Sequence, residues 1–183
     1  MVDNEVKKKV IGLAFDGTGI GTDGKIWGGE FLICSFSEFK RVGQLNYIKM
    51  PGSEKVIKEP WRMAVSYLFH SYGDNQKLIN KIIDIDEDKI KNIIQLIKLN
   101  INSPLTSSIG RLFDAIASLI GICNIITYQA QAAIKLETKA RRNLKALYNY
   151  HIENKDDYFI VNTDPLIRDI VNDKVGDLEK YLK

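Results

Sequence analysis

Histidine and cysteine are scarce in this sequence: each occurs only twice in 183 residues. Cys34 and Cys123 lie far apart in apolar surroundings and form no C-x-x-C pair, which indicates buried thiols in a reducing compartment. His70 and His151 are too few to build a histidine metal cluster from this sequence alone.

Long apolar segments are also missing. No run approaches the roughly twenty residues that a membrane-spanning helix needs, and residues 1–7 are too polar for a signal peptide. We therefore expect a cytoplasmic protein without a membrane partner.

Neither sign of charge dominates the composition. The formal net charge is +3, the hydrophobic fraction is 45% and the charged fraction is 27%, which are ordinary values for a soluble globular protein. The basic groups at residues 7–9 and 139–145 are more simply explained as solvated positions, so we expect no nucleic-acid partner. The length fits one domain with room for a core.

Residues 10–30 carry the most distinctive chemistry. Residues 10–15 are nearly all apolar and partly β-branched, which predicts a strand buried on both faces of a sheet. Asp16 ends this strand, and Gly17, Gly19, Gly21 and Gly24 follow it. Glycines let backbone N–H groups approach an anion, and a carboxylate beside them can hold a metal ion or a hydroxyl. The pattern predicts a strand, a glycine loop with a ligand site, and a second strand.

The usual phosphate-binding motifs do not fit this loop. Residues 19–24 match G-x-G-x-x-G by letters, but that motif requires a helix to begin inside it, and residues 25–34 are β-prone. A Walker loop is absent because no Gly-Lys-Ser/Thr follows the glycines. A plain hairpin with a glycine-rich turn remains an alternative.

The remaining elements change from β to α and back. The short connection between residues 26–36 and 41–48 predicts antiparallel strands, and Pro60 fits the first position of a helix. Periodicity and capping signals predict helices at 86–99, at 109–120 after a Ser107 or Ser108 cap, and at 128–145. Alternating patterns predict strands at 147–152 and 158–162. A helix that begins at Thr163 or Asp164 with Pro165 in its first position follows, and another begins within 175–183. The fold class is therefore α/β, with a largely helical middle.

Three residues near these elements have competing interpretations. Trp27 is expected in the core. Glu30 follows two glycines and could orient whatever Asp16 binds, but a solvated carboxylate is as reasonable. Arg62 lies off the apolar face of its helix and could bind a phosphate or carboxylate in a bidentate manner, although an exposed arginine is the default.

The helix at 109–120 contains a second candidate site. Its predicted apolar face consists of Ile109, Leu112, Phe113, Ile116, Ala117 and Ile120, whereas Gly110 and Asp114 share another edge. Glycine inside a helix costs about 1 kcal/mol relative to alanine, so a glycine one turn before a carboxylate indicates a surface where a ligand lies against the backbone. Close packing of another element against Gly110 is the alternative.

At three separate stretches the sequence resembles the carbamoyltransferase that matures nickel–iron hydrogenases, in its domain related to the tRNA threonylcarbamoyl-transfer proteins. The first stretch is residues 16–31, from Asp-Gly-Thr-Gly to Ile-Trp-Gly-Gly-Glu-Phe. The second is residues 45–64, ending in Glu-Pro-Trp-Arg-Met-Ala, and the third is residues 106–117, Thr-Ser-Ser-Ile-Gly-Arg-Leu-Phe-Asp-Ala-Ile-Ala. Together they span most of the chain.

The resemblance implies an actin-like, ribonuclease-H-like fold that transfers a carbamoyl group from carbamoyl-adenylate, made from carbamoyl phosphate and ATP, to the C-terminal cysteine of a partner maturation protein. It implies that Gly17, Thr18 and Gly19 lie by the nucleotide phosphates and that Gly110 and Asp114 lie near the ribose and base. It also implies that Asp16 is one ligand of a divalent metal, iron or zinc, with magnesium accompanying ATP.

The chain departs from the family pattern in several ways. The family's histidine ligands and its last aspartate have no counterpart, so residues 1–183 are expected to be a single partial domain, an interior fragment. Its parts are a strand and glycine-loop region (1–50), a helical region (51–146), and strands with the start of a helix (147–183). Gln129 stands where the family usually has glutamate, and an amide cannot supply that charge.

Two alternatives to the hydrogenase role stay open. One is a related transferase that carbamoylates a small molecule or tRNA. The other is a catalytically inactive module that docks a partner. Unpaired sheet edges in a partial domain would also favour self-association.

Overall fold

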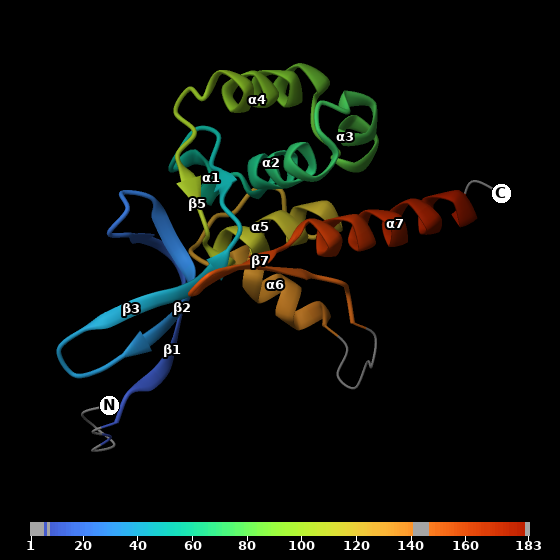
Figure 1. Cartoon of the computed structure of the whole chain (residues 1–183). Coiled ribbons are helices and arrows are strands. Elements are labelled where there is room, and N and C mark those ends of the chain that lie inside the picture. The colour runs from blue at the N-terminus through green and yellow to red at the C-terminus, as the bar shows by residue number, and fades with distance from the viewer. Residues whose placement is uncertain (1–5, 7, 141–146, 182–183) are drawn as a thin grey trace.

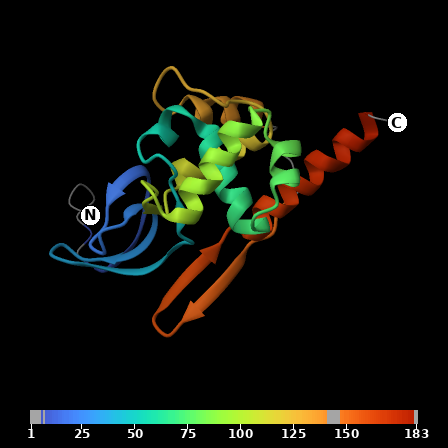
Figure 2. The same ribbon diagram turned by 90° about the horizontal axis from the view of Figure 1, so that it is seen from above.

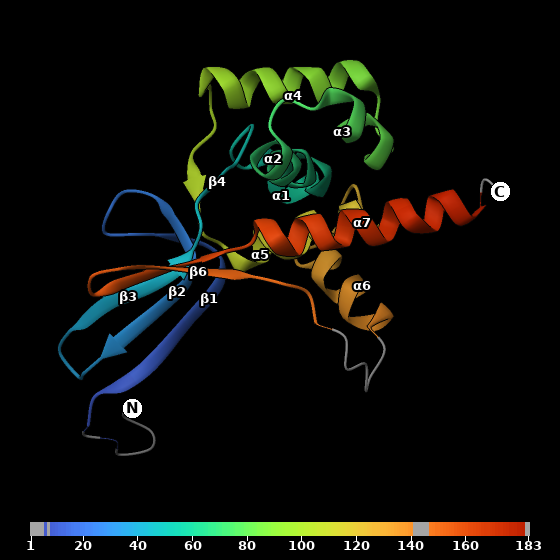
Figure 3. The same ribbon diagram turned by 45° about the vertical axis from the view of Figure 1, so that its right-hand side comes forward.

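The computed structural model describes residues 6, 8–140 and 147–181 of the chain. Strands and helices are both present, so the predicted α/β class is confirmed (Figure 1). The helices gather at one end of a curled sheet, and the first three strands project away from them (Figures 1 and 3). Within the described ranges, no helix has the length and apolar character needed to cross a membrane.

One mixed sheet joins all the described strands. They are β1 (Val10–Ile20), β2 (Ile26–Cys34), β3 (Phe39–Leu45), β4 (Ile48–Lys49), β5 (Leu105–Thr106), β6 (His151–Lys155) and β7 (Tyr158–Asn162). The order is β4-β5-β2-β3-β7-β6, and β1 pairs with β2. β1, β2 and β3 form an antiparallel meander, whereas β3 and β7 are parallel. The hairpin of β6 and β7 projects away from the helices in Figure 2.

The helices pack in a cluster around α2. They are α1 (Lys55–Lys58), α2 (Pro60–Tyr72), α3 (Gln76–Ile82), α4 (Glu87–Leu99), α5 (Ile109–Leu119), α6 (Gln131–Lys139) and α7 (Asp164–Tyr181). α2 contacts α4, α5 and α7. It begins at Pro60, as predicted, and ends at Gly73, whose φ of 67° suits glycine. Its buried side chains therefore form the centre of the core, which includes the fully buried Met63, Val65 and Leu68.

α4 shows how local sequence fixes a helix. The Asp86 side chain accepts a hydrogen bond from Lys89 N at 3.1 Å, and Glu87 and Asp88 stand at the positive end of the helix dipole. Asn100 ends the helix in the left-handed conformation. Ile90, Ile93, Ile94 and Ile97 then form the buried stripe that the sequence predicted.

Lys174 on α7 ties two other helices together. Its ammonium donates hydrogen bonds to Leu119 O at 2.6 Å and Ile82 O at 2.9 Å, which are the carbonyls of the last residues of α5 and α3. A cation at two helix C-termini satisfies unpaired carbonyls and complements both dipoles.

The prediction that residues 10–15 are buried on both faces is wrong. Ile11 is 79% exposed, Leu13 59% and Phe15 47%. β1 pairs only with β2 among the described strands, so it lies at an edge of the sheet. An apolar run has the same pattern in a central strand and in an edge strand with an uncovered face.

The predicted glycine loop is also placed differently. β1 continues through Gly17 and Gly19 to Ile20, and the turn occupies only residues 21–25, closed by hydrogen bonds from Gly21 N to Lys25 O and from Gly24 N to Gly21 O. The first two glycines of the motif therefore lie within a strand.

Several predicted boundaries differ from the structure. The second strand ends at Cys34 rather than at residue 36, and the third begins at Phe39 rather than at residue 41. The third strand ends at Leu45 because the chain then leaves β7, and residues 48–49 pair with β5 as β4. The predicted helix at 128–145 is described only as α6, since residues 141–146 lie outside the described ranges, and the predicted strand at 147–152 begins at His151. α7 is one helix, so the second helix predicted within 175–183 is wrong in its described part. The short helices α1 and α3 and the short strand β5 were not predicted.

We expect Ile94→Ala to lower the free energy of unfolding by about 2–4 kcal/mol, because it removes a fully buried side chain from the core. Leu99→Ala on the same helix removes a side chain that is 63% exposed and should change the stability by no more than about 0.5 kcal/mol. Urea unfolding monitored by circular dichroism measures both. Equal losses in the two variants would contradict the described core.

Candidate functional site

The first half of the candidate site is a bulge in β1. Phe15 pairs with Gly29 and Gly19 pairs with Trp27, so Asp16, Gly17 and Thr18 together oppose Gly28 alone. Such a bulge bends a strand and redirects its side chains. Gly28 has a φ of 148°, and a side chain there would collide with Asp16 O and come within 3.1 Å of Ser108 Cβ. Glycine is therefore required opposite the bulge.

The second half is the N-terminus of α5, which contacts the bulge directly. A methyl group on Gly110 would lie 2.8 Å from the Cα atom of Gly17, closer than real Cβ contacts allow. The Ser108 hydroxyl lies 2.7 Å from both Asp16 O and Gly17 O and accepts a hydrogen bond from Arg111 N at 3.3 Å, so Ser108 is the helix cap. The close-packing interpretation of Gly110 thus holds, and the element packed against it is the glycine bulge itself.

Glu30 holds the backbone beneath this contact. It is fully buried, so the alternative of a solvated carboxylate is wrong. Oε2 accepts hydrogen bonds from Gly28 N at 2.6 Å and Gly29 N at 2.8 Å, and Oε1 accepts one from the Ser107 hydroxyl. A buried carboxylate with three donors is well compensated for its lost hydration. Glu30 therefore joins β2 to the residue before the α5 cap, and it acts on the site through the backbone.

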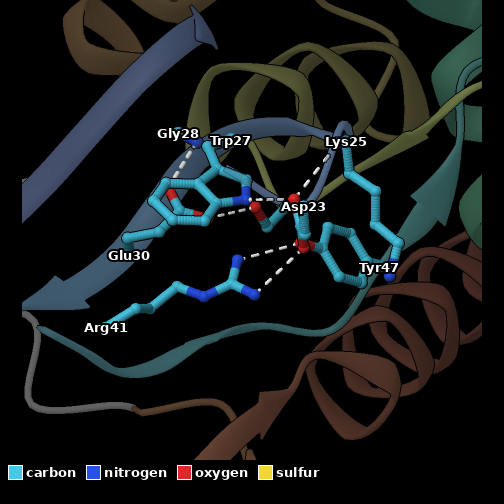
Figure 4. A network of polar contacts seen from close by, with 8 residues as sticks. Asp23, Lys25, Trp27, Gly28, Glu30, Arg41 and Tyr47 are labelled. Atoms are coloured by element: carbon cyan, nitrogen blue, oxygen red, sulfur yellow. Dashed lines mark hydrogen bonds and ion pairs between the residues drawn. The ribbon is translucent and has the colours of Figure 1, made fainter. Parts of the chain in front are cut away.

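Asp23 is the centre of a polar network beside the bulge (Figure 4). Oδ1 accepts from Trp27 Nε1 at 2.9 Å and Lys25 N at 3.1 Å, and Oδ2 accepts from Tyr47 OH at 2.6 Å and Arg41 Nη2 at 3.0 Å. The Arg41 guanidinium stacks on the Trp27 ring at 4.1 Å, and that ring covers Gly21. Burial alone would raise the pKa of Asp23, but these hydrogen bonds outweigh it and hold the pKa well below its usual range.

Trp27 is consequently a member of this network and is only half-buried, so the expectation that it lies in the core is wrong. The spacing of Asp23 and Trp27 within one turn is visible in the sequence. Arg41 lies on β3 and Tyr47 lies between β3 and β4. No local pattern in the sequence indicates that these two residues contact Asp23.

Asp114 lies one turn after Gly110 and is 3% exposed. Its Oδ2 is 2.8 Å from Arg111 Nη2, and Arg111 is itself buried. Burial raises the pKa of Asp114 to about 6 although Arg111 acts in the opposite direction. The predicted apolar face of this helix is therefore partly wrong: Phe113 and Ile120 are about 40% exposed, while Arg111, Asp114 and Ser118 are buried.

Asp16 and Arg62 remain outside the buried part of the site. The Asp16 carboxylate is exposed and accepts a hydrogen bond from Gly17 N at 2.5 Å. Arg62 pairs with Glu59, lies over the Trp61 ring at 5.1 Å and borders Gly52, so its observed contacts are not with the bulge. A groove of about 400 Å³ does open beside Thr18 and Gly19, between β1 and α1.

The described residues offer accessible backbone at the bulge but no set of metal ligands. At the bulge Thr18 is exposed and Gly17 and Gly19 are half-buried, so their backbone is open to an anion, and the buried Asp114 carboxylate lies one turn after Gly110. By contrast, the described residues contain no group of three or more histidine, cysteine, aspartate or glutamate side chains that could hold a metal ion. Asp16 alone does not make a metal site.

Comparison with known proteins places the chain in a family. Residues 12–181 match the family described as "Carbamoyltransferase, Kae1-like Domain, second subdomain". The chain belongs to this family. It is 38% identical to the carbamoyltransferase HypF of Synechocystis sp. over 92% of the chain and 24% of that protein, and 38% identical to the carbamoyltransferase HypF homolog of Cupriavidus necator over 80% of the chain and 37% of that protein.

Solved HypF structures have the same fold. A crystal structure of full-length HypF in the phosphate- and nucleotide-bound form superposes with a TM-score of 0.87 at 34% identity, over 96% of this chain and 27% of that one. The crystal structure of T. kodakarensis HypF gives a TM-score of 0.73 at 26% identity, over 90% of this chain and 22% of that one. The predicted family is thus confirmed, and the chain spans between 22% and 37% of the length of these HypF relatives.

We expect Gly110→Ala to destabilise the chain by about 1–3 kcal/mol, because its methyl group overlaps Gly17 and must push α5 away from β1. Gly176→Ala is the matched control: it is also a helical glycine, but nothing lies within 4 Å of its added methyl, so it should stabilise the chain by up to about 1 kcal/mol. Thermal unfolding of both variants tests this. A neutral Gly110→Ala would mean that the bulge and α5 are not in contact.

A second prediction concerns Asp23. We expect Asp23→Asn to lower stability at pH 7 by about 1–2 kcal/mol, since the amide cannot accept all four hydrogen bonds. The folded state holds the pKa of Asp23 below its unfolded value near 3.8, so this contribution is present above pH 4 and is lost as the pH falls further. Urea unfolding at pH 7, 4 and 2.5 should show the difference between variant and wild type shrinking in acid, and Glu137→Gln on α6 serves as an exposed control. A difference that does not change with pH would count against the network.

Proposed function

We propose that this chain forms the nucleotide-binding part of a carbamoyltransferase that transfers carbamoyl from carbamoyl-adenylate to the C-terminal cysteine of a partner protein in nickel–iron hydrogenase maturation. The observation that carries the proposal is the glycine contact between the β1 bulge and α5, with Asp114 one helical turn away. Its resemblance to a HypF solved with phosphate and nucleotide supports a nucleotide as the ligand.

In this proposal each part of the site has one task. Backbone N–H groups around Gly17, Thr18 and Gly19 neutralise phosphate oxygens, and the positive end of α5 points toward the same bulge. Asp114 accepts hydrogen bonds from the ribose hydroxyls through Oδ1, because Oδ2 is buried against Arg111. Glu30 and the Asp23 network keep the bulge in place before the ligand arrives, which reduces the entropy lost on binding.

The transfer itself needs an acceptor thiolate. Its sulfur attacks the carbamoyl carbon, an S–C bond forms, and the C–O bond to the phosphate breaks so that AMP leaves. Preorganised donors at the phosphate favour this step because they stabilise the leaving group as its charge develops. The described residues do not form a metal site, so we assign no step to a metal ion. Asp16 would contribute at most one ligand to iron or zinc, and ATP would bring its own magnesium.

We expect the wild-type chain to bind ATP with magnesium in isothermal titration calorimetry, and Asp114→Ala to weaken binding at least tenfold because the ribose loses its acceptor. Asp16→Ala should weaken binding less, since Asp16 lies beside the phosphates without a partner other than Gly17 N. Asp88→Ala, an exposed carboxylate on α4, should leave binding unchanged.

The alternative of an inactive docking module gives a different result. A wild-type chain that is folded by circular dichroism but binds no nucleotide would overturn the proposed function and favour that alternative. Binding unaffected by Asp114→Ala would place the nucleotide elsewhere on the chain.

A further inference from the structure

Arg111 and Asp114 form an ion pair that is buried beneath the candidate site. Arg111 is 8% exposed and Asp114 is 3% exposed, and Nη2 lies 2.8 Å from Oδ2. Removing two charges from water costs several kcal/mol per ion, and an apolar pair of similar size usually packs as well. Two leucines at these positions would therefore stabilise the fold about as well as the ion pair does.

The pair is incompletely satisfied within the described residues. Apart from the ion pair itself, Arg111 Nε and Nη1 and Asp114 Oδ2 have no hydrogen-bond partner there. The two arginine nitrogens and Asp114 Oδ2 are inaccessible to solvent, so a ligand does not reach these three atoms in this arrangement. Arg111 is thus poorly placed to bind an anion directly.

The guanidinium does reach the back of the bulge. Its Nη2 atom would lie 3.8 Å from a Cβ atom on Gly17, and the same nitrogen pairs with Asp114. Arg111 therefore stands between the bulge and the carboxylate and fixes the position of one relative to the other.

We propose that Arg111 is a positioning residue: it holds Asp114 Oδ2, keeps the carboxylate charged beside the Gly17–Gly110 contact, and leaves Oδ1 as the atom that accepts hydrogen bonds from the ribose hydroxyls. This inference rests on the proposed nucleotide function. A charged carboxylate accepts two hydrogen bonds from a diol, whereas a protonated one must use part of its capacity as a donor.

The other charged groups around α5 do not perform this task. Tyr67 on α2 is fully buried and its pKa is raised far above the ordinary value, so it stays neutral. Asp164 at the start of α7 bonds Ser71, and Lys174 bonds Leu119 O at the far end of α5. On β2, Glu30 is held by Ser107 and two backbone N–H groups, and Glu137 on α6 is exposed. Arg111 is the cation that contacts Asp114.

The test is the pH dependence of ATP affinity in the 183-residue chain, measured by calorimetry from pH 5 to 8.5. Wild type should lose affinity about tenfold per pH unit below about pH 6, where Asp114 becomes protonated. Arg111→Gln removes the charge but can still hydrogen-bond Asp114. We expect its profile to shift upward by at least one unit, so that it binds about fivefold more weakly than wild type at pH 6 and equally well at pH 8.5. Arg111→Lys keeps the charge and should restore most of the wild-type profile.

A structural role alone predicts another outcome. If Arg111→Gln loses affinity equally at every pH, or keeps the wild-type midpoint, the positioning role is overturned. Arg111→Met provides the same comparison if Arg111→Gln does not fold. Asp114→Asn should bind weakly and should show only the pH dependence that the ATP phosphates themselves bring.

Carbon-13 NMR titration of the Asp114 carboxyl without nucleotide separates this inference from the proposed function. If the midpoint of Asp114 shifts upward in Arg111→Gln and the wild-type chain binds ATP, both the inference and the proposed function are supported. If the midpoint shifts but the wild type binds no ATP, the nucleotide function fails and only the control of the Asp114 charge by Arg111 stands. A midpoint equal to that of wild type overturns the inference even when ATP binds.

Discussion

The contact between the α5 N-terminus and the β1 bulge is the constraint on which the rest of this structure depends. Gly17 and Gly110 meet with no room for a Cβ atom, and Ser108 hydrogen-bonds the bulge carbonyls from the same helix end. Glu30 fixes Gly28 and Gly29 from behind and reaches Ser107. This contact is one of the places where the sheet meets the helix cluster, and the candidate ligand groups lie around it.

This arrangement explains why polar side chains are buried near the site. Glu30 and Asp114 are both buried carboxylates, but their surroundings differ. Glu30 has three hydrogen-bond donors, whereas Asp114 has one arginine and pays more for its burial, which is why the pKa of Asp114 is raised. The satisfied carboxylate holds the frame, and the less satisfied one is the better candidate to accept a ligand.

Local sequence predicted those parts of the fold that local forces decide. Pro60 and Gly73 bound α2, Asp86 caps α4, and Ser108 caps α5, because each supplies the φ value or side-chain acceptor that a helix end needs. The glycine motif and the Gly110–Asp114 pair were predicted as ligand sites from residues 16–31 and 106–117, and that role stays a prediction. What sequence could not predict is which surfaces are covered: Ile11 and Leu13 are exposed although they are apolar, and Arg111 is buried although it is charged. Those outcomes depend on elements distant in the chain, as does the meeting of Asp23 with Arg41 and Tyr47.

Helix α5 is anchored at both ends by different parts of the chain. Its first turn is wedged against the bulge through Gly110, and the carbonyl of its last residue, Leu119, is held by Lys174, which also holds Ile82 at the end of α3. Eleven residues at about 1.5 Å each make this helix roughly 16 Å long. Because both of its ends are held, α5 links the position of the glycine bulge to the positions of α3 and α7.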